Sequence, residues 1–231
     1  MDHKLTIGKY VGVFQKDSYS GDLIHNWKSN YENKFSRFDV TSAFAQLFSV
    51  KDEKELVLIQ KACHTTCLLF SKFVKKEIVS IVDQDKKVKH KRLTAQIESA
   101  LFEGEKYLPP GVSSDLVEHC FPPILQSGGK YQLKFSTASD EEKLHFGTII
   151  ICMGVRYKTY CSSLVRTMMV MPDNTQKEIY TFLLDVYQLI LTKLIPGTPS
   201  SDVYNSAVSY IEVCLFFILY SHRANTKYLY M

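Results

Sequence analysis

Two short stretches of the sequence carry side chains that could perform chemistry. Cys63, His64 and Cys67 have the i, i+1 and i+4 spacing with which one helix can offer zinc ligands. The chain has no second cysteine or histidine pair at zinc-finger distance, and both thiols fall on an apolar stripe, so the pattern favours core packing. Cys161, beside Ser162, could be a nucleophile, but the sequence places no base next to it, which favours a packed strand.

Two further stretches could contact phosphate. Lys86–Arg92 (KKVKHKR) clusters its charges as a nuclear import signal or a phosphate-contacting patch does. A solvated entrance to a helix is the simpler interpretation of such a charge run. Ser127, Gly128 and Gly129 could cradle a phosphate, but no strand-turn-helix pattern follows them. A hairpin turn is therefore the favoured interpretation of this stretch.

The elements that must position these residues begin with a short α/β pattern. Apolar spacing predicts a strand at Tyr10–Phe14, a helix containing Leu23 to Tyr31 and a second strand at Phe38–Val40. Thr41 is the expected cap of a helix that runs through Phe48. This order predicts that residues 1–50 are the end of an N-terminal α/β lobe.

The rest of the chain alternates between helical and strand patterns. A long helix is predicted from Asp52 to about Ser80, and a second amphipathic helix around Leu93 and Ile97. Four strands, antiparallel, and then two helices are expected after the Pro122–Pro123 pair, with Ser200 or Ser201 capping the last helix. The predicted strands are Tyr131–Thr137, Phe146–Met153, Arg156–Cys161 and Val165–Met171, and the helices are Thr175–Leu194 and Asp202 to about Tyr220. This pattern predicts an α+β fold, an antiparallel sheet with flanking helices.

Composition restricts the class of protein. The 231 residues are 45% hydrophobic and 23% charged, which is typical of a globular chain, and the length fits one full domain or a small domain plus part of another. A net charge of +4 is too small to indicate nucleic-acid binding by electrostatics alone. The six cysteines, without an apolar leader sequence, favour a reduced intracellular compartment. The longest apolar run, Val213–Tyr220, is too short for a membrane-spanning helix, so no membrane partner is expected.

Several segments resemble, in order, landmarks of the creatinase/aminopeptidase P family, whose fold is called "pita-bread". They include FPPILQSG (121–128), IIICMG (149–154) and YCSSLVRT (160–167). The resemblance implies that two aspartates of the family's dinuclear metal site are replaced here by Cys152 and Ser163, and a histidine by Lys134 or Phe135. Because two adjacent hard cations need bridging carboxylates, we expect an inactive peptidase homologue without catalytic residues, metal or cofactor.

Longer strings are similar to the N-terminal peptidase-like domain of the FACT large-subunit family of histone chaperones. They include FPPILQSGGKYQLKFS (121–136) and HFGTIIICMGVRYKTYCSSLVRTMMV (145–170). The resemblance implies core histones as partners, an HMG-box subunit contacted through other domains, and replication factors. It implies a nuclear, chromosomal protein that reorganises nucleosomes in transcription, replication and repair, without reading a specific DNA sequence.

The resemblance predicts three regions and a set of candidate contact residues. Residues 1–50 are a remnant of the N-terminal lobe, 51–213 the first half of the pita-bread domain, and 214–231 a divergent tail. Two interpretations of the whole chain remain beside the chaperone module, namely a residual metallo-aminopeptidase and a non-functional truncated product. Arg166 could line the vestigial pocket or simply anchor the sheet. The candidate cleft or histone-contact residues are Ser127, Gly128, Lys134 and Arg166.

Overall fold

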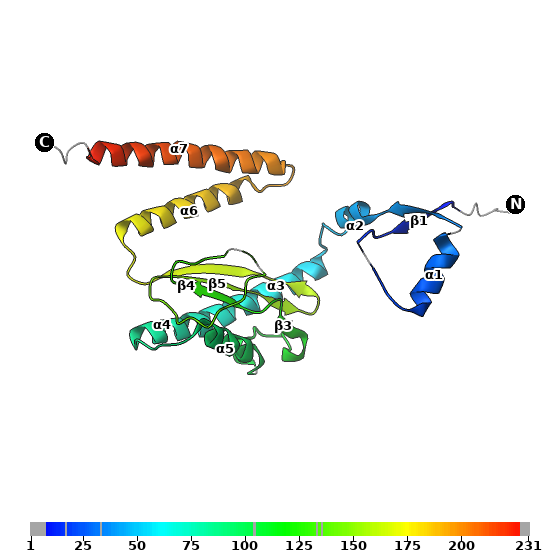
Figure 1. Ribbon diagram of the computed structural model, residues 1–231, viewed down its shortest axis with the longest axis horizontal. Helices are drawn as coiled ribbons and strands as arrows, with labels where there is room; N and C mark the ends of the chain where they lie inside the picture. Colours follow the sequence, from blue (N-terminus) through cyan, green and yellow to red (C-terminus); the bar gives the residue numbers. More distant parts are fainter. Residues whose placement is uncertain are drawn as a thin grey trace. The chain divides into compact units, whose positions relative to one another are not determined.

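The computed structural model describes residues 8–16, 18–32, 34–103, 105–132, 134 and 136–226 (Figure 1). The chain forms two compact units, each built from several segments. The first unit comprises Met1–Glu77, Ile97–Pro122 and Met153–Leu164, and the second comprises Ile78–Gln96, Pro123–Cys152 and Val165–Met231. Both units combine helices with antiparallel strands, so the predicted α+β class is confirmed.

The N-terminal elements of the first unit have the predicted order. Strands β1 (Tyr10–Val13) and β2 (Ser36–Asp39) pair in parallel, and helix α1 (Asp22–Glu32) lies between them in the sequence. A parallel pair needs a crossover connection of this kind, because a tight hairpin reverses the chain direction. Whether residues 1–50 are the remnant of a larger lobe stays a prediction.

The role predicted for Thr41 is wrong. Helix α2 spans Thr41–Leu47, so Thr41 is its first residue, and Val40 occupies the cap position without a side-chain hydrogen bond. The Thr41 hydroxyl and N–H instead both donate to Oδ1 of Asp39, at 2.5 and 2.9 Å. These two bonds lower the pKa of the Asp39 carboxyl and fix the corner between β2 and α2.

The predicted long helix is confirmed and ends slightly later than expected. It consists of α3 (Glu53–Leu69), a π-helical segment η1 (Phe70–Val74) and α4 (Lys75–Asp83). A capping box starts α3, because the Asp52 carboxylate accepts from the Glu55 N–H at 2.8 Å and the Glu55 carboxylate accepts from the Asp52 N–H at 2.7 Å. The apolar pattern gave no sign of the π-helical turn.

The first unit contains a small antiparallel sheet next to α3. Its strand order is β3 (Val117–His119), β6 (Val155–Tyr157) and β7 (Tyr160–Cys161), and α3 contacts both β6 and β7. The strand predicted at Arg156–Cys161 is therefore two strands, because Lys158 turns the chain with a φ of 56°. The short helices η2 (Glu105–Tyr107) and η3 (Ser114–Leu116) precede β3.

A buried polar cluster joins α3 to this sheet. The hydroxyl oxygens of Thr66 and Ser162 are 2.5 Å apart, and Thr66 Oγ1 accepts from the Val155 N–H at 3.2 Å. Ser162 also donates to the Val155 carbonyl at 2.9 Å. Since these groups are buried, each hydrogen bond offsets a desolvation cost that an apolar core would not carry.

The second unit contains the other antiparallel sheet, of order β4 (Ile124–Ser127), β5 (Thr148–Met153) and β8 (Leu164–Met169). Helix α5 (His90–Phe102) confirms the predicted amphipathic helix, although its last residues belong to the first unit. The strand predicted at Tyr131–Thr137 is wrong for its described residues, none of which is extended in a sheet. The strand lies earlier, at β4, directly after the two prolines.

The chain continues with the two predicted helices, α6 (Asn174–Lys193) and α7 (Ser200–Thr226). Asp173 and Gln176 form a second capping box at the start of α6. Helix α7 begins at Ser200, so Ser200 and Ser201 are its first two residues and not its caps. The two helices contact each other, with the rings of Phe182 and Tyr210 stacked at 6.1 Å. Within the described residues, no helix has the length and apolarity needed to cross a membrane.

Candidate functional site

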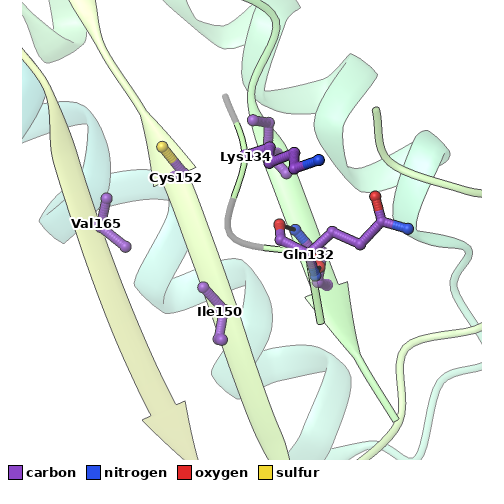
Figure 2. A pocket seen from close by; sticks show the side chains of 7 residues that line it. Gln132, Lys134, Ile150, Cys152 and Val165 are labelled. Carbon is purple, nitrogen blue, oxygen red and sulfur yellow. Dashed lines mark hydrogen bonds between the residues drawn. The ribbon is translucent and has the colours of Figure 1, made fainter. Parts of the chain in front are cut away.

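A small hollow lies on the sheet of the second unit. It has a volume of about 100 Å³, and Figure 2 shows the side chains around it. Ile150 and Cys152 are two residues apart on β5, so their side chains point to the same face of the sheet. Their ladder partners on β4 are Gln126 and Ile124, so two alternate residue pairs of the β4–β5 ladder form most of the wall. The lining residues are Ile124, Gln126, Gln132, Lys134, Ile150, Cys152 and Val165.

Two glutamines hold the segment after β4 against the hollow. The side-chain oxygen of Gln126 accepts from the Gln132 N–H at 2.6 Å, and the Gln126 amide donates to the Gln132 carbonyl at 2.9 Å. This side chain therefore replaces the neighbouring strand that the sequence predicted, and it satisfies both backbone groups of Gln132. It also fixes the part of the chain that brings Lys134 to the hollow.

Two of the residues singled out from the sequence line this hollow together. Cys152 is buried in its wall, and Lys134 lines the same hollow from a segment earlier in the chain. Burial raises the pKa of the Cys152 thiol. The shift disfavours the thiolate, which is the form that binds metals and attacks electrophiles.

The structure does not bring Ser163 and Arg166 to the hollow. Ser163 is exposed directly before β8 and is not one of the lining residues. Along β8, Val165 lines the hollow, and Arg166, as the next residue, points to the opposite face. The guanidinium of Arg166 donates to the carbonyl of Val165 at 2.8 Å.

Ser127 lies outside the hollow, in a hydrogen-bonded chain that the sequence did not reveal. Its hydroxyl oxygen is 2.7 Å from Nε2 of His90, and Nδ1 of His90 is 2.6 Å from Oδ1 of Asp140. The N–H of His145 donates to the same hydroxyl at 2.8 Å. Gly128 follows with a φ of 83°, which confirms a turn after Ser127. It does not confirm a tight hairpin, because the next strand among the described residues, β5, begins only at Thr148.

The basic stretch is paired with an acidic loop of the same unit. Lys89 and Lys91 contact the two carboxylate oxygens of Glu141, at 3.2 and 3.0 Å. These two lysines lower the pKa of Glu141. The stretch leads into α5 with exposed lysines, as the solvated-helix interpretation predicted. Its histidine, His90, is buried and therefore differs from the lysines around it.

The cysteine cluster of α3 is not packed in the core. Cys63 and Cys67 are both exposed, so the predicted core packing is wrong, because the buried stripe of α3 runs instead through Ala62, Thr66 and Leu69. Among the described residues no group of three or more histidine, cysteine or acidic side chains could hold a metal ion. For Cys120, burial and the neighbouring Cys161 thiol raise the pKa to about 11.

Comparisons with known proteins place this arrangement in a family. The family model described as metallopeptidase family M24 matches residues 57–225, which is most of the chain. The chain belongs to metallopeptidase family M24. The M24 match includes all three strands around the hollow and both elements that carry Ser127 and His90.

Sequence relatives show which members of the M24 family this chain resembles. The chain is 38% identical over 220 residues to FACT complex subunit ctc-2 of Neurospora crassa, covering 89% of this chain and 21% of that protein. It is 35% identical over 211 residues to FACT complex subunit spt-16 of Caenorhabditis elegans, covering 90% of this chain and 20% of the relative. The chain thus spans about a fifth of the length of these relatives, and the predicted similarity to the FACT large subunit is confirmed.

Solved structures agree with this placement. The N-terminal domain of FACT complex subunit SPT16 from chickpea matches 88% of this chain and 48% of that chain, with a TM-score of 0.79 and 33% identity. X-Pro aminopeptidase from Thermotoga maritima matches 88% of this chain and 53% of its own, with a TM-score of 0.65 and 19% identity. The second match supports the fold alone, and the predicted pita-bread fold of the M24 family is confirmed.

Proposed function

We propose that this chain is a peptidase-like module of a FACT-type histone chaperone, which binds histones or other peptides without metallopeptidase chemistry. The observation that carries this proposal is the level of similarity. FACT complex subunit ctc-2 is 38% identical over 89% of this chain, whereas the aminopeptidase from Thermotoga maritima is only 19% identical. Assignment to the nucleus and the chromosome follows from the same relatives and is part of the proposal.

The chemistry of the hollow supports a module without metal. The family resemblance puts a metal-binding aspartate at the position of Cys152, whose thiol stays neutral. Lys134, which lines the same hollow, adds a positive charge where a peptidase of this type would hold two cations. A cation next to a metal site raises the cost of binding the metal, because like charges repel. At the second aspartate position of the family resemblance, Ser163 has a neutral hydroxyl and lies outside the hollow.

The same hollow suits a peptide side chain. Its walls are mostly apolar, from Ile124, Ile150 and Val165, and its polar groups are two amides and one ammonium group. A pocket of this composition favours an aliphatic side chain that lies next to a carboxylate or a carbonyl oxygen. Core histones are the first partner to test and replication factors the second, and contact with an HMG-box subunit belongs to other domains of a longer protein.

A pull-down of core histones on the purified chain at moderate salt tests this function. We expect retention of histones by the natural chain and weaker retention by Lys134→Ala, because this substitution removes the cation of the hollow. Lys130→Ala is the matched control, since Lys130 is exposed on the same segment but does not line the hollow. Absence of histone retention by the natural chain would contradict the proposal.

Metal analysis separates this function from a residual aminopeptidase. We expect emission spectrometry of the purified chain to find metal far below one equivalent, and proline-containing dipeptides to remain uncleaved. Stoichiometric metal together with dipeptide hydrolysis would instead support the peptidase interpretation.

A further inference from the structure

Three side chains of the second unit form a hydrogen-bonded chain that the hollow does not use. Ser127 ends strand β4, His90 is the first residue of α5, and Asp140 precedes β5 in a loop. The Ser127 oxygen lies 2.7 Å from His90 Nε2, and His90 Nδ1 lies 2.6 Å from Asp140 Oδ1. A hydroxyl, an imidazole and a carboxylate in this order are the arrangement that activates serine nucleophiles.

The protonation states follow from what each group can donate. Burial works to raise the pKa of Asp140, but the hydrogen bonds from His90 and from the Glu142 N–H outweigh it and lower the pKa. The carboxylate is therefore ionised at neutral pH and can only accept, so Nδ1 of His90 carries a proton. When the ring is neutral, Nε2 is the acceptor and the Ser127 hydroxyl donates a hydrogen bond to it. This direction is the one that general-base activation needs.

His90 and Ser127 differ in how far they are exposed to solvent. The His90 ring is 2% exposed, so water does not compete for its two partners, whereas Ser127 is only half-buried. The two residues after Ser127 are glycines with φ values of 83° and 90°. A Cβ at Gly129 would meet no atom within 4 Å, whereas one at Gly128 would lie 3.6 Å from the His145 side chain. The turn is therefore open at Gly129, and we expect a small reagent to approach the half-buried hydroxyl from that side while the base stays shielded.

We propose that Ser127 is a reactive nucleophile that accepts an acyl group from an activated ester. In this step the Ser127 oxygen bonds to the carbonyl carbon, and His90 Nε2 takes the hydroxyl proton. The bond from the carbonyl carbon to the leaving oxygen then breaks, and His90 returns the proton to that oxygen. The products are an ester of Ser127 and a free alcohol. The step needs no metal, so it is independent of the function proposed above.

A fluorophosphonate probe tests the reactivity of Ser127 on the complete 231-residue chain. The Ser127 oxygen would displace fluoride from phosphorus, and peptide mass spectrometry would locate the adduct. We expect an adduct on Ser127 that Ser127→Ala removes and that His90→Gln slows by roughly 10²-fold, the usual contribution of a general base. Ser80→Ala is the control, because Ser80 is a half-buried serine of α4 whose hydroxyl accepts a hydrogen bond from the neutral Gln84 amide. A natural chain that labels Ser127 no more than Ser80 would overturn the proposal.

A second pair of variants keeps the test decisive if Ser127→Ala fails to fold. Ser127→Cys places a thiol at the same point, and a neighbouring base makes a thiol reactive below its ordinary pKa of about 8.5. We expect iodoacetamide to alkylate Ser127→Cys at neutral pH at least about tenfold faster than the double variant with His90→Gln. Equal rates in two variants with the same circular dichroism melting curve would show that His90 only holds the structure together.

Discussion

The two small antiparallel sheets of this chain have the same number of strands, but one packs against a helix and the other carries a hollow. In the first unit, the sheet β3-β6-β7 lies against α3, and the buried hydroxyls of Thr66 and Ser162 hydrogen-bond to each other between helix and sheet. In the second unit, the sheet β4-β5-β8 leaves a hollow of about 100 Å³ between side chains of different chemistry. The comparison indicates that the first sheet stabilises the fold and that the second is available for binding.

The largest effect is expected at Gly154, between the two strands β5 and β6. A Cβ at this position would lie 2.2 Å from the carbonyl oxygen of Ser162 and 3.2 Å from the ring of Phe121. Because a backbone atom cannot move aside cheaply, we expect Gly154→Ala to lower the free energy of unfolding by about 3 kcal/mol or more. Urea unfolding measures this change in the free energy of unfolding. Gly8→Ala is the control, since its Cβ would meet nothing within 4 Å, and equal stability of the two variants would contradict the packing described here.

Two valines test the comparison between the sheets directly. Val155 on β6 is 0% exposed, whereas Val165 on β8 is 47% exposed beside the hollow. We expect Val155→Ala to cost about 2 kcal/mol of unfolding free energy and Val165→Ala less than about 0.5 kcal/mol, since the same truncation removes very different buried areas. Thermal melts of both variants measure the difference. Similar costs would show that the two sheets do not have separate roles.

A smaller loss is expected when the buried hydroxyl of Thr66 is removed. Thr66→Val keeps the shape of the side chain but deprives the Val155 N–H and Ser162 of a buried partner. We expect a cost of about 1–2 kcal/mol, because Ser162 remains as a longer partner of that N–H at 3.4 Å. Thr192→Val is the control at an exposed threonine of α6. A neutral result for Thr66→Val would mean that the cluster adds no net stability.

These elements also show which parts of the fold the sequence predicts. The start of α3 is predictable because Asp52 and Glu55 form the capping box locally, without help from the rest of the chain. The strand predicted after Gln126 is wrong because a side chain pairs with the Gln132 backbone, and no propensity or alternation pattern contains that information. The exposure of Cys63 and Cys67 was missed for a related reason, since the stripe that packs is chosen by the sheet beside the helix.

Some residues of the candidate site could be predicted from the sequence, and others could not. Cys152 and Lys134 were selected through family resemblance, and they line one hollow because β5 and the segment held by Gln126 lie together. His90 was hidden in a charge run, where composition indicates a solvated surface, although its ring is buried between Ser127 and Asp140. A contact across 37 and 50 positions cannot be read from local pattern, so the triad required the structure.

The smallest expected effect is a loss of stability in acid through Glu55, which links α3 to the sheet of the first unit. The Asp52 N–H and then the Tyr160 hydroxyl donate to Glu55, at 2.7 Å each, and lower the pKa of Glu55 below its usual 4.5. A carboxyl whose pKa is lower in the folded chain stabilises it above pH 4.5 and loses that contribution as pH falls through the lowered value. We therefore expect the stability difference between the natural chain and Glu55→Gln, measured by urea unfolding, to be largest at neutral pH and to decrease as the pH falls below 4.5 and through the lowered pKa of Glu55.

Glu53→Gln is the control for this titration, because it removes a carboxylate from the same turn and leaves the capping box intact. A difference that stays constant with pH for Glu55→Gln would mean that the amide changes packing and not protonation. A difference that grows in acid would reverse the sign required by the lowered pKa of Glu55. Only the decrease with acid is consistent with a charged Glu55 that joins the start of α3 to β7 through Tyr160.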